Sequence, residues 1–116
     1  MRSIAYDKAY RFSIRIIKFW SKFHETKAES YLCKKLLHIG TSVGATLAQA
    51  YGATTDIDFS DKLSIAYKDC QETLYWLSLL SDIDHLSDDE FDKLKQDANE
   101  LERLLFAILK SSRIFT

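Results

Sequence analysis

Apolar residues recur along the chain in steps of three and four and form four separate stripes. This spacing places successive apolar side chains on one face of an α-helix. The first stripe predicts a helix from about residue 3 to 25, and the second predicts a helix that ends near Gly52. The stripes are Ala5, Ala9, Phe12, Ile16, Phe19 and Phe23; Leu32, Leu36, Ile39, Val43, Leu47 and Ala50; Phe59, Leu63, Ala66, Cys70, Thr73, Leu77 and Leu80; and Phe91, Leu94, Ala98, Leu101, Leu105 and Ile108.

Three of the stripes follow residues that commonly cap helix N-termini. A hydroxyl or carboxylate at the cap accepts a backbone N–H, and a Glu three residues later completes a capping box. The fourth start is the clearest, because an apolar staple flanks its box. These signals are Thr26 with Glu29, Thr55 or Asp56, and Ser87 with Glu90 between Leu86 and Phe91.

The whole chain, residues 1–116, is predicted to be one all-α domain. It has no proline and three glycines, so the usual breakers of helical structure are scarce. Helices of about 20 residues joined by short loops bury their stripes against one another and run antiparallel. We therefore expect an antiparallel up-and-down four-helix bundle, with a three-helix arrangement around one broken helix as the alternative.

The net charge of −1 conceals two halves of opposite sign. Residues 1–50 carry nine Lys and Arg against three acidic residues, whereas residues 51–116 carry seven against fourteen. Five cations of the first helix share one face, and two more follow on the second. One hypothesis is that this basic ridge binds RNA or DNA phosphates; the alternative is a face that is solvated or paired with acidic residues. The candidates are Lys8, Arg11, Arg15, Lys18, Lys22, Lys34 and Lys35.

Apolar side chains also lie beside the core stripes, so the apolar arc of the first helix covers about half its circumference. Large aromatic residues in such positions are typical of subunit interfaces. The sequence therefore predicts a homo-oligomer. The candidate interface residues are Tyr6, Tyr10, Ile17 and Trp20 on the first helix and Trp76, Leu79 and Ile83 on the third.

Small residues recur every four positions on the second helix at Gly40, Gly44 and Ala48. A phosphate-binding glycine loop needs a strand-to-helix turn, which this helical pattern does not offer. We interpret the strip as a place where another helix packs closely.

Candidate chemistry is sparse, and we predict that the protein is not an enzyme. Neither the histidines nor the two cysteines have the spacing of a metal site, so no metal or cofactor is expected. Cys33 and Cys70 are interpreted as buried thiols, with a redox pair as the alternative. No apolar run is long enough to cross a bilayer, and no signal peptide is evident. Because two cysteines are too few for a disulfide scaffold, a protein of the reducing cytoplasm is expected.

Several segments of the chain resemble bacterial four-helix bundle proteins encoded in ribosomal RNA intervening sequences. The segments are Gly40–Ala45, Asp58–Phe59, Lys62–Leu63, Ala66 and Glu72–Leu77. The resemblance covers nearly the whole chain and extends to accessory variability determinants of diversity-generating retroelements. It implies a homopentameric ring of bundles and no settled biochemical activity. The family usually reads Ala-Asn-x-x-Glu-Ala/Gly, whereas here Thr46 replaces the amide and Gln49 the carboxylate.

Overall fold

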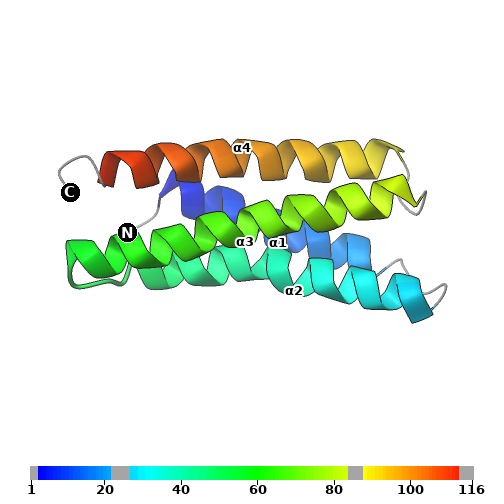
Figure 1. Cartoon of the computed structure of the whole chain (residues 1–116), viewed down its shortest axis with the longest axis horizontal. Helices are drawn as coiled ribbons and strands as arrows, with labels where there is room; N and C mark the ends of the chain where they lie inside the picture. Colours follow the sequence, from blue (N-terminus) through cyan, green and yellow to red (C-terminus); the bar gives the residue numbers. More distant parts are fainter. Residues whose placement is uncertain (1–2, 22–26, 84–87, 113–116) are drawn as a thin grey trace.

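A computed structural model describes residues 3–21, 27–83 and 88–112, without the side chains of residues 27–30 and 88. Its elements are α1 (Ile4–Trp20), α2 (Lys27–Ala50), α3 (Asp56–Asp82) and α4 (Asp88–Ser112). The helices lie side by side in a rod of 47 × 21 × 20 Å, and consecutive helices run in opposite directions (Figure 1). Both α1 and α3 pack against α2 and α4, so α1 lies diagonally across from α3. The predicted up-and-down four-helix bundle is confirmed.

Two helices begin at hydroxyl caps that the structure describes. The Ser3 hydroxyl accepts the Tyr6 N–H at 2.9 Å, and the Thr55 hydroxyl accepts the Asp58 N–H at 3.1 Å. Both caps have extended backbone, as an N-cap requires. Thr55 is therefore the cap of α3, and Asp56 is its first residue.

Several predicted boundaries lie outside the described residues. They are the end of the first predicted helix (22–25), the Thr26–Glu29 capping box and the Leu86–Ser87 part of the last box. Within the described ranges, α1 ends at Trp20 and α2 ends at Ala50.

The described residues of the four predicted stripes meet in one continuous hydrophobic core, with three changes at helix ends. At the start of α3, Phe59 is only partly buried. On α2, Cys33 is buried while Leu32 is only partly buried. On α4, Leu109 replaces Ile108 as the last buried residue. A helix of 3.6 residues per turn drifts away from a strict seven-residue repeat. On α4, a second step of four, from Leu105 to Leu109, therefore brings the stripe back toward the core.

Buried polar groups on α3 have partners. The Thr73 hydroxyl donates to the Asp69 carbonyl at 2.8 Å, and the Cys70 thiol donates to the Ala98 carbonyl of α4 at 3.4 Å. Burial, assisted by the charges of Glu102 and Asp69, raises the pKa of the Cys70 thiol from 9.0 to about 12. Cys33 and Cys70 are both buried, and neither forms a disulfide.

The small-residue strip brings α1 close to α2 at two of its three positions. Gly40 and Gly44 are buried, and a Cβ at Gly40 would collide with Ile16 Cδ1. A Cβ at Gly44 would meet Ser13 Oγ at 3.5 Å and the Ala9 carbonyl oxygen at 3.6 Å. Ala48 is exposed, so the predicted close packing does not extend to it in the single chain.

Candidate nucleic-acid and subunit interfaces

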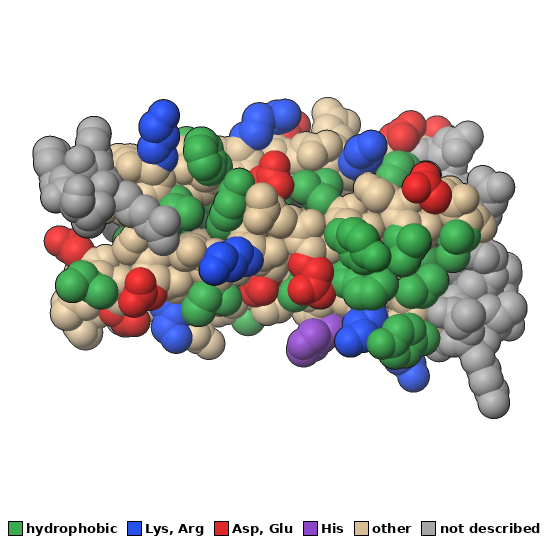
Figure 2. All heavy atoms as spheres, viewed as in Figure 1, with side chains coloured by type: hydrophobic (Ala, Val, Ile, Leu, Met, Phe, Trp, Pro, Cys, Tyr) green, Lys and Arg blue, Asp and Glu red, His purple; other side chains and the backbone are tan. Residues whose placement is uncertain are grey.

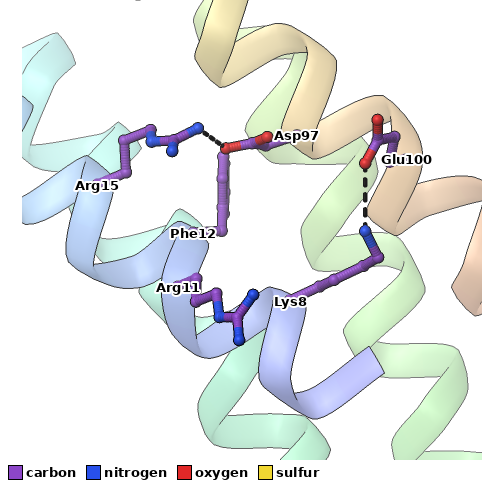
Figure 3. Close-up of a pocket in the computed structure, with 6 residues that line it drawn as sticks. All are labelled: Lys8, Arg11, Phe12, Arg15, Asp97 and Glu100. Atoms are coloured by element: carbon purple, nitrogen blue, oxygen red, sulfur yellow. Dashed lines mark hydrogen bonds and ion pairs between the residues drawn. The ribbon is translucent and has the colours of Figure 1, made fainter. Parts of the chain in front are cut away.

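The cations of α1 lie along its flank toward α4. Lys8, Arg11, Arg15 and Lys18 are all exposed, and their spacing of three or four residues aligns them in a row. Three of them line a shallow hollow between α1 and α4, above the buried Phe12 ring (Figure 3). Lys22, the fifth residue of the predicted row, lies outside the described residues.

Two of these cations are paired with carboxylates of α4. Lys8 Nζ lies 3.3 Å from Glu100 Oε2, and the Arg15 guanidinium contacts the Asp97 carboxylate (Figure 3). All four side chains are about a third to a half exposed, so water weakens the pairs. Two of the four described cations of α1 are therefore paired with acidic residues, as the alternative interpretation of the ridge expects.

The other two cations, Arg11 and Lys18, have no carboxylate partner within the described ranges. Figure 3 shows Arg11 between the two ion pairs, without a contact to Asp97 or Glu100. Further along the contact between α1 and α4, Lys18 and Arg15 line a second hollow together with Lys93 and Glu90 of α4. We call these two hollows the α1–α4 groove. Past the ion pairs its walls carry cations from both helices and one acidic side chain, Glu90.

Sequence reasoning missed Lys93, because it lies in the acidic half of the chain. Its place opposite Lys18 depends on how α4 is rotated against α1, which no local pattern reveals. Asp97 and Glu100 were likewise expected only as part of a general acidic surface.

Lys34 and Lys35 do not extend the ridge, contrary to the hypothesis. They are exposed on α2, whereas the cations of α1 face α4 on the other side of that helix. Lys35 Nζ instead lies 5.5 Å from the centre of the Tyr31 ring. The reason is geometric: α2 packs on the flank of α1 that carries Ser13 and the apolar side chains, not on the cationic flank.

The flank of α1 opposite the cations carries the predicted apolar residues. Tyr10 and Ile17 are 57% and 50% exposed. Tyr6 and Trp20 are partly buried against the core, and the Tyr6 and Tyr10 rings lie 6.2 Å apart. We call Tyr6, Tyr10, Ile17 and Trp20 the α1 apolar surface.

A second apolar surface covers the C-terminal part of α3 and the N-terminal part of α2. Figure 2 shows hydrophobic side chains gathered there, next to cationic side chains. Of the predicted residues, Ile83 is 41% exposed, while Trp76 and Leu79 are partly buried. The Trp76 indole N–H donates to Glu72 at 3.0 Å, which fixes the ring on the surface.

Two tyrosines in this surface were missed from the sequence. Tyr31 and Tyr75 are 57% and 58% exposed, and the Tyr75 ring packs edge-on against Trp76 at 5.1 Å. Both fall outside the core stripes, which is the signal that could have identified them. We call Tyr31, Tyr75, Trp76, Leu79 and Ile83 the α2–α3 apolar surface.

Other kinds of site find little support among the described residues. No three His, Cys, Asp or Glu side chains in the described ranges are arranged as metal ligands. The helices in those ranges lack the combination of length and hydropathy that a bilayer span needs.

A family model described as 23S rRNA-intervening sequence protein matches residues 1–107. The chain belongs to this family. The structure is also similar to the crystal structure of a protein of unknown function from the S23 ribosomal protein family of Bacteroides thetaiotaomicron. The TM-score is 0.86 at 33% identity, and the match covers 92% of this chain and 99% of the other. A comparison with curated proteins found no match.

The position where the intervening sequence protein motif has its amide lies between α2 and α3. Thr46, 8% exposed, donates a long hydrogen bond of 3.5 Å to Asp69 Oδ2. The Ser42 hydroxyl donates to the same oxygen at 2.9 Å. In this chain two hydroxyls of α2 therefore donate hydrogen bonds to a carboxylate of α3. Gln49, at the position where the family usually has a carboxylate, is exposed.

Proposed function

We propose that this protein is a non-enzymatic module that assembles into a homo-oligomer in the cytoplasm. The observation that supports this proposal is the pair of separate apolar surfaces, one on α1 and one on α2–α3. Each includes residues at least 40% exposed in the single chain. Large exposed aromatic side chains are favoured where protein surfaces meet, because they bury much area and keep a polar tip.

The positions of the surfaces favour a ring. A cyclic assembly with an odd number of subunits uses a head-to-tail contact, in which two different surfaces of each subunit meet. Because α1 and α3 are diagonal in the bundle, their surfaces point in different directions and suit this arrangement. Together with the pentamer that the family resemblance implies, this leads us to propose a homopentamer.

Light scattering coupled to size-exclusion chromatography tests the proposal. At micromolar concentration we expect a mass five times the 13.4 kDa of the chain. A mass of 13.4 kDa under these conditions would remove the assembly proposal. A different multiple would retain assembly and reject the pentamer.

Nucleic-acid binding is the second candidate function, and the unpaired cations favour it. Arg11 and Lys18 of α1 are exposed without a carboxylate partner in the described chain, and Lys93 adds a cation from α4. A groove with such cations can neutralise backbone phosphates of RNA or DNA without reading bases. If this function fails, the protein-interaction module remains.

The groove is tested by replacing Arg11, Arg15 and Lys18 with glutamine. Fluorescence anisotropy with labelled RNA and DNA should show weaker binding for all sequences. The slope of log affinity against log salt should fall by roughly 0.7 to 0.9 for each phosphate that the groove no longer neutralises. The control replaces the exposed Lys68, Lys95 and Lys110, which removes the same charge outside the groove. No wild-type binding at low salt, or equal losses in both variants, would reject this site.

A further inference from the structure

The cations of α1 alternate between paired and unpaired along the α1–α4 groove. Lys8 contacts Glu100, and Arg15 contacts Asp97. Arg11, three residues after Lys8, and Lys18, three residues after Arg15, have no carboxylate partner in the described chain. Figure 3 shows both carboxylates reaching across from α4 to the row. A chain of phosphates that engaged all four cations would therefore have to displace two carboxylates.

Carboxylate and phosphate oxygens compete for the same donors. An arginine or lysine that binds a carboxylate uses the N–H groups that it would offer to a phosphate. Here the pairs are accessible from solvent, since the Lys8 and Arg15 side chains are 44% and 51% exposed. Pairs of this kind are weak, so a polyanion can displace them at a modest cost.

We propose that Glu100 and Asp97 act as built-in competitors of a nucleic-acid backbone and keep the α1–α4 groove partly neutralised. This inference rests on the nucleic-acid function proposed above as the second candidate. Arg11 and Lys18 make the first contacts with phosphates, and Lys8 and Arg15 join only when the carboxylates are displaced. The ion pairs thus lower the affinity of the groove for RNA or DNA.

The test removes the competitors and keeps the cations. The variant Asp97→Asn with Glu100→Gln should bind labelled oligouridine about tenfold more tightly than the wild type, as expected for two exposed pairs. Its salt slope should steepen by roughly 0.7 for each additional phosphate that the released cations neutralise. The control, Asp61→Asn with Asp92→Asn, makes the same charge change at exposed positions outside both hollows of the groove. The affinity of this control variant for oligouridine should rise clearly less than that of the Asp97→Asn and Glu100→Gln variant, which we call the competitor variant.

A second variant tests whether the higher affinity comes from Lys8 and Arg15, the cations released from their ion pairs. Adding Lys8→Gln and Arg15→Gln to the Asp97→Asn and Glu100→Gln variant should return the affinity to the wild-type level or below. Thermal denaturation checks that every variant remains folded, which the exposure of these side chains favours.

The outcomes separate the inference from the function on which it rests. If the wild type binds and the affinities of the competitor and control variants rise equally, the inference is overturned and the nucleic-acid function stands. If neither the wild type nor the competitor variant binds at low salt, both are overturned. Binding by the competitor variant with none by the wild type or control would support the competition by the carboxylates and overturn the nucleic-acid function of the wild-type groove.

Discussion

Gly40 and Gly44 lie one turn apart on α2, yet α1 approaches them differently. The Cβ missing from Gly40 would occupy the space of Ile16 Cδ1, whereas the space beside Gly44 accommodates a Cβ at ordinary contact distances. The sequence predicted the same role for both residues, because their spacing is the same. The difference arises from the side chain that α1 places opposite each one.

Gly40→Ala and Gly44→Ala should therefore differ in their effects on stability. Alanine in a helix is favoured over glycine by about 1 kcal/mol, so Gly44→Ala should keep or raise the thermal midpoint. Gly40→Ala has the same gain but must displace Cδ1 of the fully buried Ile16, and overpacking of this kind costs about 1 to 3 kcal/mol. Its midpoint should be lower than that of Gly44→Ala. Thermal denaturation followed by circular dichroism measures both, and the reverse order would contradict the packing.

Cys70 should be unreactive in the folded protein. Its pKa is raised to about 12, first by burial, so the thiolate is scarce at pH 8. A Cys33→Ala variant, which retains only Cys70, should react with Ellman's reagent in denaturant but not in buffer. The stability that the neutral thiol contributes is complete below pH 9 and is lost as the pH rises from about 9 to 12. Rapid reaction of the native variant would contradict this burial.

At the scale of elements, α1 has three distinct flanks. Its core flank and both outer flanks could be assigned from the sequence, because the position of a side chain around a helix depends only on the residue number. Which neighbour each flank meets could not be assigned. The bundle places α4 beside the cationic flank of α1 and the glycine strip of α2 against the side of α1 that carries Ser13. The two ion pairs follow from the first of these placements.

The start of α3 depends on one hydroxyl. Thr55→Ala removes the acceptor for the Asp58 N–H and should lower the free energy of unfolding by about 1 kcal/mol. Thr55→Ser keeps the acceptor and serves as the control. Urea denaturation of the three proteins measures the difference. Equal midpoints for the alanine and serine variants would show that the cap does not stabilise α3.

At the scale of the whole molecule, a head-to-tail ring makes a prediction about mixtures. A variant with Tyr10→Glu and Ile17→Glu loses the α1 apolar surface, and one with Tyr31→Glu and Tyr75→Glu loses the α2–α3 apolar surface. Each should be monomeric alone, because buried unpaired charge opposes assembly. Mixed in equal amounts, they should form a 1:1 dimer through the one intact surface that each retains.

Light scattering of the separate and mixed variants measures this result. If each surface instead pairs with its own copy, each variant alone should form a dimer and mixing should add nothing. The four substitutions are at exposed positions, so circular dichroism should show folded helices in both variants.

The sequence by itself determined the four helices and the core faces of each, because helical periodicity and end caps are local properties of the chain. It also separated the cationic flank of α1 from its apolar flank. Only the tertiary structure decided that Glu100 and Asp97 meet two of the cations, that Lys93 joins the groove, and that Lys34 and Lys35 lie apart from it. These arrangements depend on which helices are neighbours and how each is rotated about its axis. That choice comes from burying all four stripes at once, which no single segment can encode.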